Sequence, residues 1–207
     1  MQLPHDDLHP LLKLTTPSKI QDFLDTLAIN HERGGETCMS PLQVLAHKKA
    51  HCLEGALVAA AALALQGKKP LLMNLKAAPG DDDHAVTLYK INGYWGAVSK
   101  TNHASLRFRD PIYKTPRELA ASYFHEYFVN KTGKKTLRSY SLPFNPTTVQ
   151  KDWMTAKKNL WKVAYALRGA RHHDLVPKKN RSYIRNADLV ERRAGAIIEW
   201  KKNHPRT

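Results

Sequence analysis

The feature that most constrains this chain is an alanine-rich segment that is apolar on almost every side. Residues 56–65, ALVAAAALAL, contain no polar side chain, and Gly67 follows as a helix terminator. A helix that is apolar all round must be covered by other elements, so we place this one at the centre of the fold. The segment is too short to cross a bilayer, and we expect no membrane partner.

Cys52 lies where this apolar helix is predicted to begin. The first turn of a helix has unpaired N–H groups and the positive end of the dipole, which both favour a thiolate. Lowering a thiol pKa by two units requires about 2.7 kcal/mol, whereas a helix terminus supplies about 0.3–1 kcal/mol, or about 2 when partly buried. The helix alone leaves Cys52 mostly protonated, so a reactive thiolate needs an imidazolium partner. The alternative is an inert, buried cysteine.

A histidine in the next predicted hairpin can be that partner. His84 opens an apolar strand segment, and Asn92-Gly93 is a strong signal for a two-residue turn before a returning strand. Counting back across this turn pairs His84 with Thr101 and places Ser99 diagonally opposite His84 on the same face of the sheet.

The remaining elements indicate an α+β fold in which the central Cys-bearing helix packs on an antiparallel sheet. Outside the hairpin and the central helix we expect helices over residues 16–30, 41–50, 116–127, 149–173 and 187–203, and strands over 70–77 and 136–144. We divide the chain into a core, residues 1–145, and a helical extension, residues 146–207, packed on or next to it. Apolar stripes on both extension helices predict core contacts, and His172-His173 is expected at a helix end.

The positive charge of the chain is concentrated in its second half. Residues 131–207 hold 19 Lys and Arg against 5 Asp and Glu, whereas residues 1–130 hold 14 against 13. A basic helical region can bind nucleic acid or another polyanion, and it can equally be a solvated surface. No zinc-finger spacing, ribonucleoprotein motif or clear helix-turn-helix is present, which argues against specific reading of a base sequence.

The two cysteines favour a reducing compartment. Cys38 and Cys52 occur in a chain whose first residues lack the basic and apolar regions of a secretory signal. We therefore expect two free thiols and a cytoplasmic location.

A metal site is a competing use of the same residue types. His47 and His51 are four residues apart on a predicted helix and therefore share a face, and Cys38, Cys52 or His84 could complete a tetrahedral set. No clean ligand spacing supports such a site. We expect no metal and no other cofactor.

The order of these pieces resembles the transglutaminase-like branch of the papain-fold cysteine enzymes. In that family a nucleophilic Cys starts a buried helix, a His begins a strand in a pattern like DHAV, and a hairpin brings a third polar residue beside the His. The matching pieces are AHCLEGA, DDDHAVTLYK and NGYWGAVSKTNH. The resemblance covers about residues 40–113 and extends at most to residue 144.

This resemblance implies a cysteine hydrolase or acyltransferase that acts on an amide, peptide or isopeptide bond. Cys52 would attack the carbonyl carbon, His84 would take or hold the thiol proton, and a thioester acyl-enzyme would be released to water or an amine. Gln43, on the helix before Cys52, would donate to the oxyanion as a Gln upstream of the Cys does in papain-like enzymes, and the alternative is a surface side chain. The backbone N–H of Cys52 is the safer donor, because a helix start supplies it without a side chain. We expect a peptide or protein substrate and favour hydrolysis, because nothing identifies an amine acceptor site.

The third catalytic residue is where this chain departs from the family, which would have an Asp near Ser99. Serine can accept a hydrogen bond from an imidazole but carries no charge. We rank Asn102 first, as the papain-type orienting residue, Ser99 second, and Asp110 third because it lies far along the chain. The alternative function is an inactive transglutaminase-like fold that serves as a basic binding module for nucleic acid or another polyanion.

Overall fold

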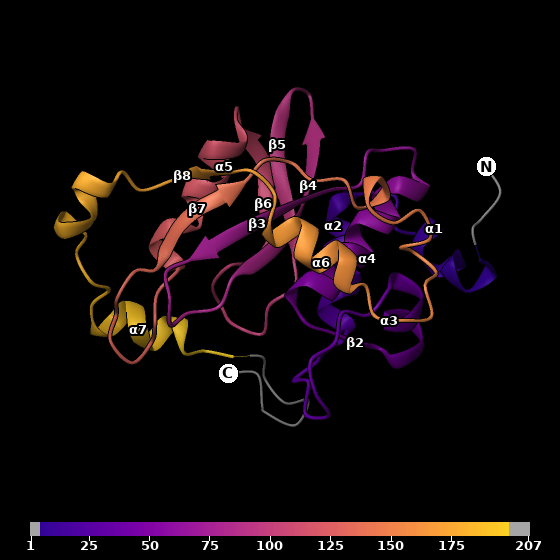
Figure 1. Ribbon diagram of the computed structural model, residues 1–207, viewed down its shortest axis with the longest axis horizontal. Coiled ribbons are helices and arrows are strands. Elements are labelled where there is room, and N and C mark those ends of the chain that lie inside the picture. Colours follow the sequence, from indigo (N-terminus) through magenta and orange to yellow (C-terminus); the bar gives the residue numbers. More distant parts are fainter. Residues whose placement is uncertain (1–4, 199–207) are drawn as a thin grey trace.

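The computed structural model describes residues 5–198 and has an α+β fold around an antiparallel sheet (Figure 1). The strand order is β6-β5-β4-β3-β7-β8, and each neighbouring pair is antiparallel. The bounds are β3 Leu71–Ala77, β4 His84–Ile91, β5 Tyr94–Ser99, β6 Arg109–Tyr113, β7 Leu137–Ser141 and β8 His172–Asp174. A short parallel pair joins β1 (Ala28–Ile29) to β2 (Lys49–Ala50). The predicted α+β class with an antiparallel sheet is confirmed.

The central helix is α4, Cys52–Leu65, as the apolar segment predicts. Eleven of its residues are buried, which leaves Cys52, Leu53 and Ala64 with some exposure. It packs against β4 and lies among α1 (His9–Leu12), α2 (Pro17–Thr26) and α3 (Pro41–His47) (Figure 1). In the part of the chain that the structure describes, no helix is both long and apolar enough to span a bilayer.

The start of α4 is held tightly against the chain that follows β5. A Cβ atom added to Gly55 would lie 2.4 Å from the Cβ atom of Lys100, so only glycine fits there. Lys100 is fully buried, and its Nζ donates a hydrogen bond to the Leu27 carbonyl at 2.6 Å. This contact brings the residues after β5 next to the first turn of the helix.

The β4–β5 hairpin has the predicted turn and register. Asn92 and Gly93 have φ angles of 49° and 88°, as a two-residue hairpin turn requires. Val86 pairs with Ser99, so Ser99 is the diagonal neighbour of His84 as predicted. The predicted pairing of His84 with Thr101 does not form, because β5 ends at Ser99.

Each face of the sheet has its own cover. The α4 face packs against the N-terminal helices and α6 (Trp161–Arg168), and its core includes Leu57, Val98 and Val163. The opposite face is covered by α5, Pro116–Ser122, and by the 3-10 helix Phe124–Glu126 that follows it.

The predicted helix over residues 149–173 is wrong for most of its length. Only α6 is a regular α-helix, because the preceding residues form local turns and also bond to the segment before α3. Leu160 N–H donates to the Cys38 carbonyl at 2.7 Å, and the Asn159 side chain accepts from Cys38 N–H at 3.1 Å. The predicted core contacts of this stripe are confirmed for its large side chains, since Trp153, Leu160, Val163 and Leu167 are buried.

The rest of the extension also differs from its prediction. His172-His173 lies in β8, which pairs with β7, and not at a helix end. The last helix, α7, covers Leu189–Gly195, and its apolar stripe is exposed, with Leu189 56% and Ile198 55% accessible, so the predicted core contacts are wrong. The remainder of the predicted helix, from residue 199, lies outside the described residues. The division at residue 145 stays a prediction.

Two N-terminal helices end earlier than predicted. The chain leaves α2 at Thr26 to form β1, and it leaves α3 at His47, where Lys48 adopts a left-handed conformation with φ of 53°. His47 and His51 therefore do not share a helix face, and the geometry assumed for the metal alternative is wrong.

Candidate active site

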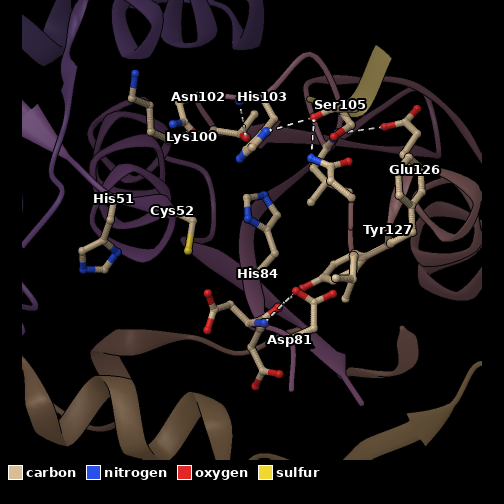
Figure 2. Close-up of a pocket in the computed structure, with 18 of the residues that line it drawn as sticks. His51, Cys52, Asp81, His84, Lys100, Asn102, His103, Ser105, Glu126 and Tyr127 are labelled. Atoms are coloured by element: carbon tan, nitrogen blue, oxygen red, sulfur yellow. Dashed lines mark hydrogen bonds between the residues drawn. The ribbon is translucent and has the colours of Figure 1, made fainter. Parts of the chain in front are cut away.

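Cys52 is the first residue of α4, and local hydrogen bonds define this helix start. The Nδ1 atom of His51 accepts from Leu53 N–H at 3.2 Å, and the Glu54 carboxylate accepts from His51 N–H at 3.0 Å, which forms a capping box. The thiol is partly exposed and lines a cavity of about 400 Å³ that His84 also lines (Figure 2). The structure thus brings the predicted nucleophile and base together.

The hydrogen bonds of Ser99 fix the tautomer of His84. The Ser99 hydroxyl donates to the Leu106 carbonyl at 2.6 Å, because a carbonyl can only accept. The same hydroxyl lies 2.8 Å from Nε2 of His84, so it accepts the Nε2–H. The unprotonated Nδ1 atom remains to receive the proton of Cys52.

Ser99 is itself held in place by a buried glutamine. The Gln21 side chain accepts from Ser99 N–H at 3.0 Å and donates to the Ser99 carbonyl at 2.9 Å. This pair of bonds fixes the backbone of Ser99, the last residue of β5. The acceptor for His84 is therefore rigidly positioned.

The two cysteines have opposite electrostatic surroundings. Burial raises the pKa of Cys52, but hydrogen bonds and positive charge from His51 and His84 outweigh it and bring the pKa from 9.0 to about 5. For Cys38, burial and the charge of Glu54 raise the pKa to about 12. At neutral pH, Cys52 is a thiolate and Cys38 a thiol.

His51 is the second imidazole beside Cys52, and two influences on its proton compete. Burial lowers its pKa, whereas the Cys52 thiolate and Glu54 raise it to about 9. Its Nε2 lies 3.0 Å from the Thr37 carbonyl and donates there, so Nδ1 can accept from Leu53 N–H only while His51 is neutral. This cap therefore opposes the protonation that the Cys52 thiolate and Glu54 favour. Protonating Nδ1 would cost the cap on Leu53 N–H, whereas His84 can take the thiol proton without losing a hydrogen bond.

Glu54 ties the helix start to the loop before α3. Its carboxylate is fully buried and accepts from Thr37 Oγ1 at 2.7 Å, from Met39 N–H at 2.9 Å and from Asn30 Nδ2 at 3.0 Å. These bonds satisfy an otherwise costly buried charge. They also hold the His51 side chain, whose Nε2 lies 3.5 Å from Glu54.

The three candidates for the third residue lie in different places. Ser99, ranked second from sequence, is the one that bonds His84. Asn102, ranked first, lines the same cavity, and among residues 5–198 no hydrogen bond joins it to His84 (Figure 2). Asp110 is exposed on β6 and lines a different cavity, with Trp95. Ser99 lies closer to His84 in the sheet register than Asn102 does.

Gln43 does not face Cys52. It is the third residue of α3, where its amide accepts from Ser40 N–H at 3.0 Å and donates to the Lys157 carbonyl at 3.1 Å. It lines another cavity, beside His47. The oxyanion donor that remains at the thiol is the backbone N–H of Cys52, at the open end of the helix.

The site has no ligand set for a metal. Within the described range, no group of three or more His, Cys, Asp or Glu side chains is arranged to hold an ion. His51 was considered from sequence as a metal ligand only, although its position directly before Cys52 marks it as the cap of the helix. The role of His51 could therefore have been predicted from the sequence, because it directly precedes the first residue of the predicted helix.

Comparisons with known proteins do not assign this chain to a family. No family model matches the chain, and none of the curated proteins aligns with it significantly. The function must therefore be argued from the geometry of the site.

Proposed function

We propose that this chain is a cysteine hydrolase of the transglutaminase-like, papain-fold type that cleaves an amide, peptide or isopeptide bond. The observation that carries the proposal is the hydrogen-bonded series from Leu106 through Ser99 to His84, which leaves one imidazole nitrogen for the Cys52 thiol. A nucleophile, a base and a group that orients the base are the minimum for this chemistry.

The reaction would proceed in two steps. The Cys52 thiolate attacks the carbonyl carbon, the C=O electron pair moves to oxygen, and the Cys52 N–H stabilises the oxyanion. As the intermediate collapses, the C–N bond breaks and the His84 imidazolium gives its proton to the leaving amine. Water then attacks the thioester while His84 takes its proton, which releases the carboxylic acid and restores the thiolate-imidazolium pair.

Ser99 orients His84 without adding a negative charge. An Asp in its place would stabilise the imidazolium electrostatically, whereas a hydroxyl that also donates to Leu106 offers only one acceptor. The uncharged partner should make the His84 imidazolium less stable than in an Asp-containing triad. We therefore expect slow turnover relative to such triads. We favour water over an amine as the acyl acceptor for a separate reason, because nothing identifies an amine acceptor site.

An activated ester tests this proposal without knowledge of the substrate. Mixing the protein with p-nitrophenyl acetate should give a burst of p-nitrophenol and an acetyl group on Cys52, detected by mass spectrometry of the denatured protein. Cys52→Ala should abolish the burst, His84→Ala should slow it, and Cys38→Ala is the matched control that keeps it. A burst that survives Cys52→Ala would refute the proposed nucleophile.

A second function is favoured by a separate surface. The 3-10 helix Lys178–Tyr183 exposes Lys178, Lys179 and Arg181, and Tyr183 is 85% accessible. Exposed cations beside an exposed aromatic ring suit a single-stranded nucleic acid. Heparin and single-stranded RNA should bind with a steep salt dependence, and Lys178→Glu with Arg181→Glu should flatten it. Binding unchanged by that double variant would refute this role.

The proposed reaction also bears on location. Both cysteines are free in the structure, and the reaction requires Cys52 to stay reduced. We therefore propose a cytoplasmic location, which immunofluorescence or cell fractionation of the tagged protein would test.

A further inference from the structure

Cys52 lies at the junction of two cavities. The first contains His84, and the second, of about 420 Å³, reaches the thiol from the side of α6. Both are lined by His51, Cys52, Asp82 and Asp83. A substrate that occupies both cavities would therefore pass directly over the thiol.

Carboxylates dominate the charge of the second cavity, which we name the α6 cavity. Glu32, Glu36, Asp82 and Asp83 line it, and among the described residues around it Arg168 is the single lysine or arginine. Two of the acids are held internally: Glu32 accepts from Thr37 N–H, and Asp83 accepts from Ala77 N–H. Glu36 and Asp82 are exposed, and within residues 5–198 neither carboxylate has a hydrogen bond or an ion pair. These two exposed carboxylates line the cavity together with Arg168 and the imidazole of His51.

Two aromatic side chains of α6 also line the α6 cavity. Trp161 and Tyr165, one turn apart on α6, stack with ring centroids 6.2 Å apart and planes at 27°. Tyr165 is 65% accessible, so its ring is not part of the core. Aromatic faces attract ammonium and guanidinium groups, and they do so most strongly where carboxylates lie nearby.

This local charge is opposite to that of the whole molecule. The chain carries a formal net charge of +15, so its overall field should favour anions. From the carboxylates, the aromatic side chains and the position of the thiol, we infer that the α6 cavity binds a cationic side chain of the acyl donor. The substrate class is then a peptide or protein with Lys or Arg next to the scissile bond. This inference rests on the proposed function.

Paired thiol reagents of opposite charge test the inference. The trimethylammonium-ethyl and sulfonatoethyl methanethiosulfonates share one reactive group, and each forms a mixed disulfide with the Cys52 thiolate while methanesulfinate leaves. At low ionic strength the ratio of the cationic to the anionic rate constant should be at least about tenfold larger than the same ratio for a free thiolate such as that of 2-mercaptoethanol. Glu36→Gln and Asp82→Asn should each reduce this ratio about twofold to threefold. Glu118→Gln on α5, which lines neither cavity, is the matched control and should leave the ratio unchanged.

Protection by short peptides tests the ligand class directly. Acetyl-Lys-Lys-amide at millimolar concentration should slow labelling of Cys52 by neutral iodoacetamide, whereas acetyl-norleucyl-norleucine-amide should not. Tyr165→Ala should weaken the protection, because it removes the exposed ring.

The outcomes separate this inference from the proposed function. A rate ratio no larger than that of the free thiolate, with rapid labelling overall, would overturn the cation site and leave the nucleophile intact. Slow labelling of Cys52 by every reagent at neutral pH would overturn the proposed function itself. Equal protection by both peptides would show that the cavity does not select charge.

Discussion

Replacing His84 with alanine should raise the pKa of Cys52 and move the pH at which the thiol becomes reactive. The pKa of Cys52 lies at about 5 instead of 9.0, a preference for the thiolate of about 5 kcal/mol at about 1.4 kcal/mol per pKa unit. A helix terminus supplies at most about 2 kcal/mol. His51 and His84 must supply the rest and also offset the burial of the thiolate.

The expected size of this pKa change follows from the loss of the hydrogen bond between His84 and the Cys52 thiolate. A hydrogen bond to a charged group contributes about 1.5–3 kcal/mol, so removing His84 should raise the pKa of Cys52 by about 1–2 units, to between about 6 and 7. Only the thiolate reacts, so Cys52 is reactive above its pKa and loses its reactivity as the pH falls through that pKa. The variant should therefore lose its reactivity at a higher pH than the wild type.

The assay is iodoacetamide labelling from about pH 4 to about pH 9, quantified by mass spectrometry, since only the thiolate reacts. The wild-type midpoint should lie near 5. The midpoint is the decisive quantity, and the rate near pH 7 is not, because a thiolate of higher pKa is intrinsically more nucleophilic and masks part of the change.

Two controls accompany this titration. Cys38, which is buried and whose pKa is raised to about 12, should stay unlabelled in the native protein. His173→Ala removes another sheet histidine, on β8, that lines neither cavity at Cys52, and it should keep the wild-type midpoint. A wild-type midpoint near 9, or the same midpoint with and without His84, would refute the reasoning.

Three further substitutions test the structure around the thiol. Ser99→Ala should cut turnover about 10-fold to 100-fold, because His84 loses the acceptor that holds its tautomer; unchanged kcat would count against this role. Gly55→Ala should lower the free energy of unfolding in urea by about 1–3 kcal/mol, because the added Cβ would lie 2.4 Å from a side-chain carbon. The control is Gly34→Ala, which should be near neutral because no atom lies within 4 Å of the added Cβ. Glu54→Gln should lower the melting temperature, because the amide NH₂ would meet the N–H and hydroxyl donors that surround the carboxylate. Each hydrogen bond lost should destabilise the fold by about 1–3 kcal/mol, and an unchanged melting temperature would contradict this.

The relation between His84 and Ser99 could be predicted because a two-residue turn leaves no freedom in the register. Once Asn92-Gly93 forms the turn, every cross-strand neighbour follows by counting. The choice between Ser99 and Asn102 could not be made in this way. It depends on Leu106, whose carbonyl accepts a hydrogen bond from the Ser99 hydroxyl, and this contact requires the loop after β5 to fold back on the strand.

In the predicted extension after residue 145, the local sequence pattern predicted a long helix, and tertiary contacts prevented most of it from forming. Apolar residues at helical spacing correctly identified Trp153 and Leu160 as core residues. They did not predict that the backbone there would bond to Cys38, which is more than a hundred positions away in the chain. A short helix gains little from its own hydrogen bonds, so tertiary contacts decide whether it forms.

The sequence by itself determined the elements that depend on near neighbours: the buried α4, the helix start at Cys52 and the β4–β5 hairpin. Their interactions span only a few residues, and composition and turn chemistry encode them directly. Only the tertiary structure decided that Ser99 orients His84, that Gln43 faces elsewhere, and that an acidic and aromatic cavity adjoins the thiol in a strongly basic chain. Those outcomes depend on contacts between distant segments, whose geometry exists only after the whole core has packed.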